Sequence, residues 1–566
     1  RSGIFLPYDI YLLFFKLVEM KGTNKIPLLL LFVILTGCSL RVSKPKYKSS
    51  LVPESGQFFK CKMSSEIWVA DCRKDSALSK MVATAIQGII NQDSAEVYLF
   101  LGDHHVRQLN DTERKYTVLN RDSRAGNAGL QSLLDKYLNR FSYIYVWDTC
   151  KDWTWNMALM LSSQNKGIPL TREYADWVVK KYNWKGEVVD LSEEWVNKES
   201  AYNWAIAELM PKCHKNILFS VGLRDDWRGA PWTLYDYATA SGGFAFWLDD
   251  AQKDEQQIIR NICIAGKYNP GSIVMGYAKS GDDLLATVNN YGIGYVVSDY
   301  YANGSFWSAY PNKSFYQPKG KARKVKPGKI YVSIIFSDGD NLQFDQNALY
   351  LMWENDSLRG TVPVGTTMAA GLQEINPFLL EWYYKHKSEN DELVAGPSGY
   401  QFIYGRDYQK EGYESWLEKN RRWLASAGFH TACFWHATFG SYCFDRFIET
   451  AGLQGIFDGD DKTGIAYKNG VIIMNQGEHI RKEGELYNAL MKVKAKEDEP
   501  VFVNVYPIAA EYGRNGGIAK LKREIDRLEK ERPGVYEYLL PKDLAASAAR
   551  YFDKKKDDHI CLMYYK

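Results

Sequence analysis

The chain has 566 residues, of which 46% are hydrophobic and 25% charged, and its formal net charge is +3. This length is too great for one hydrophobic core, so two or three domains are expected. The balanced charge lacks the basic footprint of a nucleic-acid-binding protein, and no nucleic-acid partner is expected. Tyr, Trp and Phe make up 14% of the chain, and amphipathic rings of this kind suit sugars as well as ordinary cores.

The first segment has the pattern of an export signal. Met20-Lys21 is followed by an apolar run from Ile26 to Leu35 and then by Leu-Thr-Gly before Cys38. The run is too short to span a bilayer comfortably but suits the core of a signal peptide, with an ordinary buried helix as the alternative. The sequence before Cys38 resembles a bacterial lipobox, which implies lipidation of this cysteine. Residues 1–37 are therefore left out of the fold prediction.

Residues 38–60 are polar and are expected to tether the folded part to the membrane. Ser39 after the lipobox favours the outer membrane, so the predicted location is the bacterial cell envelope, on the periplasmic or the surface face. The other eight cysteines show neither a CxxC motif nor a Cys/His pair at zinc spacing. Structural thiols or one or two disulfides are expected, because export permits disulfides.

Residues 61–316 alternate between helical and strand patterns and form the predicted N-terminal α/β region. Apolar side chains recur at helical spacing over residues 76–92. Strand patterns occupy residues 95–102, 142–148, 215–222, 272–278 and 292–299. The alternation predicts parallel sheets in three-layer α/β units. Residues 317–329, which are rich in Lys, Arg, Pro and Gly, are interpreted as a solvated linker between domains rather than as a nucleic-acid patch.

Residues 330–566 contain eight strand patterns separated by helical segments, an arrangement typical of a (β/α)8, TIM-like barrel. A doubly wound open sheet is the alternative. The strand patterns lie at residues 329–338, 361–369, 392–400, 431–437, 455–460, 469–476, 500–507 and 534–541.

Polar and aromatic side chains follow most of these predicted strands. In a barrel the carboxyl ends of the strands carry the active site. Such a site needs one carboxylic acid and one carboxylate to cleave a glycosidic bond. The candidate catalytic acids are Asp338, Asp340, Glu374 and Glu478. The candidate substrate-binding residues are Asn341, Ser398, Tyr404, Trp435, His436, Asp458, Asp460, Asn504 and Tyr506.

Asp338 and Asp340 are two residues apart, so in extended chain their side chains face the same side. An aromatic surrounding would desolvate one of them and raise its pKa, as a general acid at neutral pH requires. The alternative is a turn whose acids cap a following helix. For Asp458-Gly-Asp460 the alternative is a solvated turn.

At two motifs the sequence resembles the GxGYxYP family, which is described as a glycoside hydrolase family of bacterial lipoproteins. The family carries an SDGDN-type stretch, matched here by Ser337–Asn341. Its name motif aligns with Gly396–Gly405, reading GPSGYQFIYG, where Gly399 and Tyr404 match. The departures are Gln401 for a glycine, Phe402 for a tyrosine and Gly405 for a proline.

The resemblance extends to the N-terminal half through residues 83–100, 236–249 and 290–308, and so covers nearly all of residues 60–566. It implies a lipid-anchored hydrolase that acts on a poly- or oligosaccharide in polysaccharide utilisation, without a cofactor. One alternative is a surface lipoprotein that binds glycans without cleaving them. Another is a metal-dependent carbohydrate esterase or deacetylase using Asp338 and His436, but no pair of histidines has ligand spacing, and no metal is expected.

Overall fold

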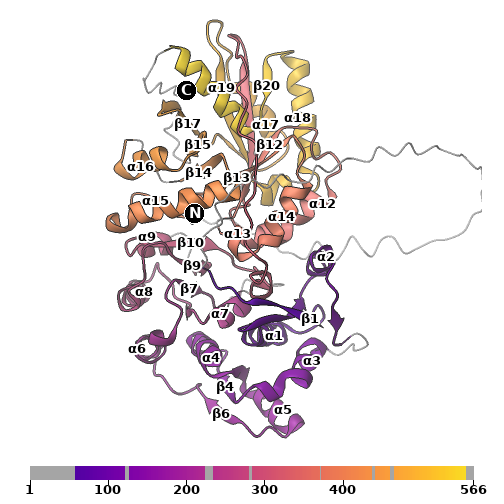
Figure 1. Ribbon diagram of the computed structural model, residues 1–566, viewed down its shortest axis with the longest axis vertical. Coiled ribbons are helices and arrows are strands. Elements are labelled where there is room, and N and C mark those ends of the chain that lie inside the picture. The colour runs from indigo at the N-terminus through magenta and orange to yellow at the C-terminus, as the bar shows by residue number, and fades with distance from the viewer. Residues whose placement is uncertain are drawn as a thin grey trace, which may run out of the picture.

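The computed structural model describes residues 58–120, 126–223, 234–279, 283–369, 371–435, 440–458 and 464–555. The signal segment 1–37, Cys38 and most of the predicted tether lie outside them. The described chain forms an elongated body with its N-terminal elements at one end and its C-terminal elements at the other (Figure 1). In this part of the chain, no helix combines the length and apolar character needed to cross a membrane.

The first two N-terminal units each contain a three-stranded parallel sheet. The first has strand order β2-β1-β3 and the second β5-β4-β6. The first unit comprises β1 (Lys62–Asp71), α1 (Ala77–Ile90), β2 (Ser94–Phe100), α2 (Asp103–Asp111), β3 (Thr117–Val118) and α3 (Ala128–Tyr137). The second comprises β4 (Tyr143–Trp147), α4 (Asp152–Asn165), β5 (Gly167–Thr171), α5 (Arg172–Tyr182), β6 (Glu187–Asp190) and α6 (Lys198–Glu208).

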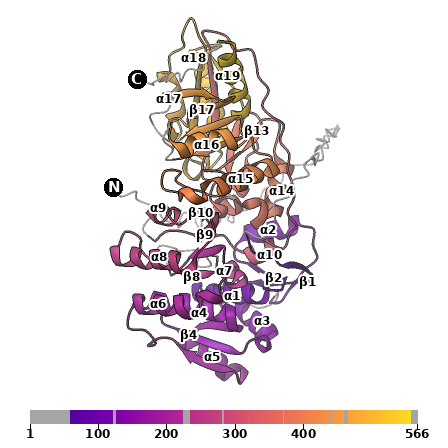
Figure 2. The same ribbon diagram turned by 60° about the vertical axis from the view of Figure 1, so that its left-hand side comes forward.

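The third N-terminal unit is a four-stranded parallel sheet of order β10-β9-β7-β8. It lies beside the C-terminal region (Figure 2). The first unit also contacts that region, through the ion pair of Arg107 on α2 with Glu354 (2.7 Å). Its elements are β7 (Ile217–Ser220), α7 (Tyr235–Ser241), β8 (Phe244–Phe246), α8 (Lys253–Gly266), β9 (Ser272–Gly276), α9 (Asp283–Asn289), β10 (Ile293–Val297) and α10 (Gly304–Trp307).

The helix predicted over residues 76–92 is α1, and its ends follow from its sequence. The Ser76 side chain accepts a hydrogen bond from Ser79 N–H at the start of α1, which satisfies a free helical donor. Gly88 lets α1 approach α7 closely, because a Cβ there would lie 2.0 Å from the carbonyl oxygen of Asp236. The first and third units are therefore packed backbone against backbone.

The C-terminal region contains all eight predicted strands and two short additional ones. Its strands are β11 (Ile330–Phe336), β12 (Val364–Met368), β13 (Asp391–Ala395), β14 (Thr431–Phe434), β15 (Gly455–Asp458), β16 (Ile465–Lys468), β17 (Val471–Asn475), β18 (His479–Ile480), β19 (Val501–Pro507) and β20 (Tyr536–Tyr538). Its helices are α11 (Leu342–Phe344), α12 (Tyr350–Asn355), α13 (Leu372–Ile375), α14 (Pro377–His386), α15 (Lys410–Ala427), α16 (Tyr442–Thr450), α17 (Glu485–Lys492), α18 (Gly517–Glu531) and α19 (Pro541–Lys555), with π-helical turns at Asp345–Leu349 and Ala509–Gly513.

The prediction of an α/β chain with parallel sheets is confirmed, but the strands form a curled half-barrel sheet rather than a ring of eight. Its order is β16-β17-β15-β14-β13-β12-β11-β19-β18, and β20 pairs with β11. β19 pairs with β11 over five residues and so occupies the edge that the eighth strand of a closed barrel would take. β20 instead pairs with the other edge of β11, the edge that β12 also uses. β20 pairs with the start of β11, at Ile330–Val332, and β12 with its end, at Ile335 and Phe336. Among the described residues, no strand pairing joins β17 to β18.

The two faces of the curled sheet are covered by different helices. Ile330, Val332 and Ile334 share a core with residues of α17 and α18. Tyr331 and Ile335 point to the other face and pack with α19. The alternation of side chains along a strand explains this division. The second face, which also carries Cys433 and Tyr506, is the inner face of the curled sheet.

Residues 317–329 lie against the C-terminal region. The Gln317 side chain is buried and donates to the carbonyl of Leu393 (2.8 Å). Further along, Lys321 N–H donates to the Asp543 carboxylate (2.7 Å) and Arg323 N–H to the Ser547 hydroxyl (2.9 Å). The cysteines in the described part of the chain are free thiols.

Candidate active site

The turn after β11 is forced into a tight shape. Asp338 has a φ of 64°, in the left-handed region that few residues adopt. Gly339 donates its N–H to the Thr367 hydroxyl (3.1 Å), and a Cβ at this glycine would lie only 1.7 Å from the carbonyl oxygen of Thr367. The turn is therefore pressed onto β12, and only glycine fits at its centre.

Asp338 and Asp340 are half-buried and electrostatically coupled. Asp338 Oδ2 accepts a hydrogen bond from Ala510 N–H (2.7 Å), so this acid is attached to the turn after β19 rather than capping the helix that follows it. Burial raises the pKa of Asp338, and the Ala510 N–H opposes that shift. Burial, and then the charge of Asp338, raise the pKa of Asp340 to about 7. The two acids are thus in different environments.

A third carboxyl, Asp345, lies beside them and was not anticipated from the sequence. It is fully buried; Oδ2 accepts from Ala369 N–H (3.0 Å), while Oδ1 has no hydrogen-bond partner in the described structure. Burial raises the pKa of Asp345 well above its usual range, and the charge of Asp340 adds to the effect. In the sequence it is an acid seven residues after Asp338, and no motif marks it as a site residue.

Tyr506 and Cys433 lie on the inner face of the sheet next to the acids. The Tyr506 hydroxyl is 3.9 Å from Cys433 Sγ, and both side chains are buried. The charges of Asp338 and Asp340 both act on Tyr506, and that of Asp340 acts on Cys433. Burial raises the pKa of the Cys433 thiol to about 12, so this cysteine is a neutral wall residue. We call Asp338, Asp340, Asp345, Cys433 and Tyr506 the carboxylate centre.

An aromatic wall adjoins the carboxylate centre. The ring of Phe402 meets Trp435 edge to face at 5.6 Å and Tyr404 at 5.4 Å. Trp435 Nε1 donates to Gln476 (3.0 Å). Gln476 also contacts His479, whose ring lies 5.5 Å from that of Tyr506. Trp435, Tyr404 and Tyr506, three of the predicted substrate-binding residues, are therefore connected through Phe402, Gln476 and His479.

The segment Gly396–Gly405 closes the centre from the side of β13. A Cβ at Gly396 would lie 2.7 Å from the Cβ of Asp340. Ser398, which has a φ of 64°, donates its hydroxyl hydrogen to the Ile403 carbonyl (2.9 Å) and its N–H to the Cys433 carbonyl (3.0 Å). Ser398 thus shapes this turn through bonds within the protein.

Three other predicted site residues, Glu374, Glu478 and Asn504, make contacts outside the carboxylate centre. Glu374 is buried where the N-terminal units meet the C-terminal region, with Lys60 and Tyr400 as electrostatic neighbours. Burial raises the pKa of Glu374 to about 7, against the effect of Lys60. Glu478 is exposed and lies 3.4 Å from Lys492. Asn504 accepts from the Ser333 hydroxyl (2.7 Å) and donates to the Gln476 carbonyl, so its amide is already committed.

Asn341 and Asp458 lie at strand and helix ends. The Asn341 side chain donates to the Asp338 carbonyl (3.3 Å), and its own carbonyl accepts from the first turn of the following helix. Asp458 is buried at the end of β15, and its carbonyl accepts from Gln476 N–H (3.0 Å). His436 and Asp460 lie outside the described residues.

Within the described ranges, no cluster of three or more His, Cys, Asp or Glu side chains is arranged to hold a metal ion. A surface hollow of about 400 Å³ is formed by the third N-terminal unit and contains none of the predicted site residues. Its lining comes from Gln256, Arg260, Ala286, Thr287, Asn290 and Tyr291.

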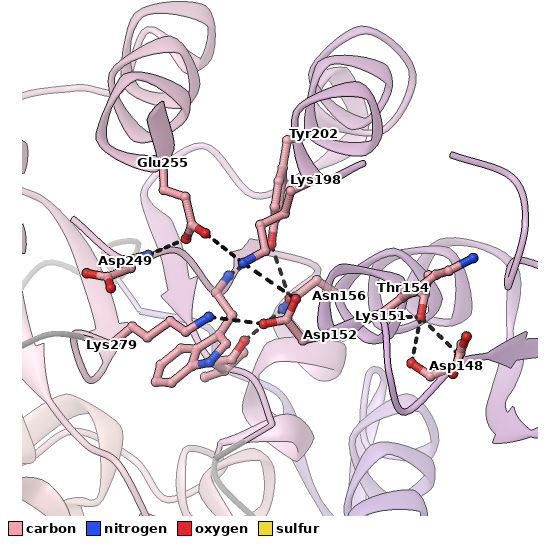
Figure 3. Close-up of polar contacts among 12 residues, drawn as sticks. Asp148, Lys151, Asp152, Thr154, Asn156, Lys198, Tyr202, Asp249, Glu255 and Lys279 are labelled. Carbon is pink, nitrogen blue, oxygen red and sulfur yellow. Dashed lines mark hydrogen bonds and ion pairs between the residues drawn. The ribbon is translucent and has the colours of Figure 1, made fainter. Parts of the chain in front are cut away.

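A second polar cluster joins the second and third N-terminal units (Figure 3). Lys198 lies between Asp152 (3.6 Å) and Glu255 (2.8 Å), and Lys279 lies 3.1 Å from Asp152. Glu255 also accepts from Asp249 N–H (2.6 Å). The two cations and two carboxylates compensate one another, which identifies the cluster as a connection between α4, α6 and α8.

Three family models match the chain, and together they cover more than half of it. They are described as "GxGYxYP putative glycoside hydrolase C-terminal domain" over residues 328–513, "GxGYxYP third domain" over 219–309 and "GxGYxYP_N second domain" over 142–213. No match was found among curated proteins.

One solved structure, "a putative hydrolase from Bacteroides thetaiotaomicron VPI-5482", is similar over 90% of this chain and 98% of its own, with 17% identity and a TM-score of 0.73. At that identity the likeness shows the fold alone. Weaker matches are "Puue Allantoinase" (13% identity, TM-score 0.28, 42% of this chain and 92% of that one) and "probable Polysaccharide deacetylase from Pseudomonas aeruginosa PAO1" (12%, 0.29, 42% and 93%). TM-scores this low carry no argument.

Proposed function

The chain belongs to the GxGYxYP family of glycoside hydrolases, and from this membership we propose that it cleaves glycosidic bonds of a poly- or oligosaccharide at the carboxylate centre. The observation that carries the proposal is the coupled pair Asp338 and Asp340, placed by a strained turn at the carboxyl end of β11. Hydrolysis of a glycosidic bond uses two carboxyl groups in different protonation states. Environments that separate two neighbouring acids supply those states.

Asp340 is assigned the role of general acid. Burial and the nearby charge of Asp338 raise its pKa to about 7, so a proton is retained near neutral pH for the leaving oxygen. Asp338 is assigned the role of nucleophile or base. It accepts a hydrogen bond from Ala510 N–H, and an N–H donor favours the charged form of a carboxyl group.

The aromatic wall supports a carbohydrate substrate. Trp435 and Phe402 are partly buried side chains that keep part of their surface open. Rings of this kind pack against the apolar face of a sugar while their polar neighbours bind its hydroxyls. Gln476 contacts both the Trp435 indole and the His479 ring, so polar groups lie beside the aromatic wall.

The test measures release of reducing ends from a panel of plant and host glycans. Wild type is compared with Asp338→Asn and Asp340→Asn, which keep side-chain size and remove the acid. Asp526→Asn on α18, whose carboxylate is exposed and pairs only with Lys522 among the described residues, is the matched control. We expect turnover by wild type and the control, and a loss of at least about a hundredfold in both site variants. Glycan binding without release by wild type would instead identify a glycan-binding protein.

We also propose that the protein is lipid-anchored at Cys38 in the bacterial cell envelope. The support is the sequence pattern of a basic start, an apolar run and Leu-Thr-Gly before the cysteine. Expression of the full chain in a bacterium with radiolabelled palmitate tests this proposal. Label in wild type and none in Cys38→Ser is expected, and equal labelling of both would contradict the anchor.

A further inference from the structure

The segment Gly396–Gln409 contacts the carboxylate centre at one end and the third N-terminal unit at the other. At the first end, Gly396 lies against Asp340. At the other, Phe402 and Tyr295 exchange both backbone hydrogen bonds in an antiparallel bridge, each 2.9 Å long. In Figures 1 and 2 the third unit, with α9 and β10, lies directly beside the part of the C-terminal region that begins with α15.

Side chains of the segment reinforce this docking. Gln401 Nε2 donates to the Gly271 carbonyl (2.5 Å). The Tyr408 hydroxyl accepts from Gly271 N–H (3.0 Å) and donates to the Gly292 carbonyl (2.7 Å). A Cβ at Gly294 would lie 2.2 Å from Gln401 Oε1, so the glutamine rests directly on the backbone of β10.

Asn289, the last residue of α9, holds the segment at two points. Its Oδ1 accepts from Tyr404 N–H (2.7 Å), and its backbone carbonyl accepts from Gln409 N–H (2.9 Å). Its Nδ2 donates to the Ile293 carbonyl (2.8 Å), which fixes the orientation of the amide. The residue is fully buried, so a Tyr404 N–H deprived of this acceptor would have no water to replace it.

The geometry points to Asn289 as a positioning residue of the carboxylate centre, acting from another structural unit. Asn289 fixes Tyr404, the residue after Ile403, whose carbonyl accepts from the Ser398 hydroxyl, and it thereby supports the left-handed turn at Ser398 and Gly399 and the contact of Gly396 with Asp340. Asn420 of α15 holds the same turn from within the C-terminal region. Strained turns persist only where contacts on both sides impose them. Docking of the third unit therefore sets the surroundings of Asp340. The catalytic consequence rests on the proposed function; the docking itself does not.

The test uses the full chain and compares Asn289→Ala with Asn290→Ala. Asn290 is the adjacent amide and is exposed, and the one side-chain bond it makes to the described residues stays within its own turn, to the Ala286 carbonyl. Hydrogen exchange is followed at the amides of Phe402, Tyr404 and Gln409. We expect exchange at the Tyr404 amide, which loses its side-chain acceptor, to accelerate by about tenfold or more in Asn289→Ala and to be unchanged in Asn290→Ala. The Phe402 and Gln409 amides keep their backbone acceptors and should accelerate less, through loosening of the segment.

A second readout separates positioning from a merely structural role. The ionisation of Asp340, followed by carboxyl-carbon NMR, is expected to shift toward the ordinary range of an aspartate in Asn289→Ala, because the segment no longer excludes water from it. The groups that face Asp340 are Asp338, Asp345, Cys433 and Tyr506, and none of them is altered. Faster exchange over the whole chain with an unchanged titration of Asp340 would overturn the inference.

If Asn289→Ala does not fold, Tyr408→Phe decides the question. It keeps the ring and removes only the hydroxyl that bridges Gly271 and Gly292. Faster exchange confined to residues 396–409 supports the inference, and unchanged exchange there contradicts it. Neither measurement uses a glycan, so a failure to find turnover would refute the proposed function while leaving this result standing.

Discussion

Gly396 touches Asp340: the Cβ that any other residue would carry at position 396 would come within 2.7 Å of the Asp340 Cβ and 2.9 Å of the Met368 carbonyl oxygen. The aspartate is thereby confined between its own turn and the segment after β13. This contact joins the two sequence motifs, SDGDN and GPSGYQFIYG, in one structure. It also explains why burial dominates the ionisation of Asp340.

Gly396→Ala is expected to be poorly tolerated, because the added methyl group meets backbone on one side and Asp340 on the other. Overpacking of this kind costs about 1–3 kcal/mol in the free energy of unfolding. It should also reduce glycan turnover by displacing Asp340. Gly126→Ala is the control, since a Cβ there meets no atom within 4 Å. Equal thermal midpoints for the two variants would show that the contact is not constrained.

Stability should depend on pH through Asp340. Its pKa rises from 3.8 unfolded to about 7 folded, so its contribution is fully present below about pH 4 and is lost as the pH rises through about 7. Asp340→Asn removes the ionisation. Relative to wild type, the variant should therefore gain stability between about pH 5 and about pH 8, by up to on the order of 3 kcal/mol.

Urea unfolding of both proteins at the two pH values checks this expectation. Glu374, whose pKa is also raised to about 7, is unchanged in the variant and cancels from the comparison. Lys60, with a pKa lowered to about 8, cancels in the same way. A stability difference between the two proteins that does not vary with pH would contradict the raised pKa of Asp340.

Arg359 and Asp391 form a buried ion pair that connects β13 to the loop before β12. The Arg359 guanidinium lies 2.9 Å from the carboxylate, whose side chain is 1% exposed. Arg359→Ala would leave the Asp391 carboxylate with the Ser388 N–H at Oδ2 and the nearby charge of Lys387, and removing one partner of a buried ion pair costs about 3 kcal/mol. Lys522→Ala, which breaks an exposed pair with Asp526, should cost less than about 0.5 kcal/mol. Denaturant unfolding of both variants compares the two costs, and similar values would refute the assignment.

The cluster of Figure 3 predicts a smaller effect at Lys198. Lys198→Met retains the aliphatic chain but removes the cation between Asp152 and Glu255. Lys279 and the Asp249 N–H still compensate one carboxylate each, so the loss should be about 1–2 kcal/mol and should shrink in high salt. A loss that does not respond to salt would mean that packing, rather than charge, sets the role of Lys198.

The sequence pattern was sufficient for eight strands of the C-terminal region, because most of them are short apolar runs next to Gly, Pro or Asp. It missed the short strands β16 and β18. It also did not determine how the strands pair. β19, which is longer than the three-residue β20, pairs with the edge of β11 that the eighth strand of a barrel would occupy. This pairing is seen only in the assembled sheet. A rule based on strand order along the chain therefore predicted a ring of eight strands, whereas the described strands form a curled half-barrel sheet.

The strand-end rule brought Asp338, Asp340 and Tyr506 together, since parallel strands share a carboxyl edge. It could not say which way a side chain points, so Glu478, which faces solvent, satisfied it equally well. Asp345 escaped it, because this acid lies in a helical turn and is held by the N–H of Ala369, the residue directly after β12. The docking of Phe402 on Tyr295 depends on residues more than a hundred positions apart, which no local pattern encodes.

The most direct test of the carboxylate pair is the pH dependence of glycan turnover. With Asp340 as the general acid, kcat of the wild type should fall as the pH rises through about 7, because the proton needed by the leaving oxygen is lost there. Asp340→Asn should remove both the turnover and this limb of the profile. A wild-type rate that stays constant from about pH 6 to about pH 8, or an Asp340→Asn variant with full activity, would contradict the account.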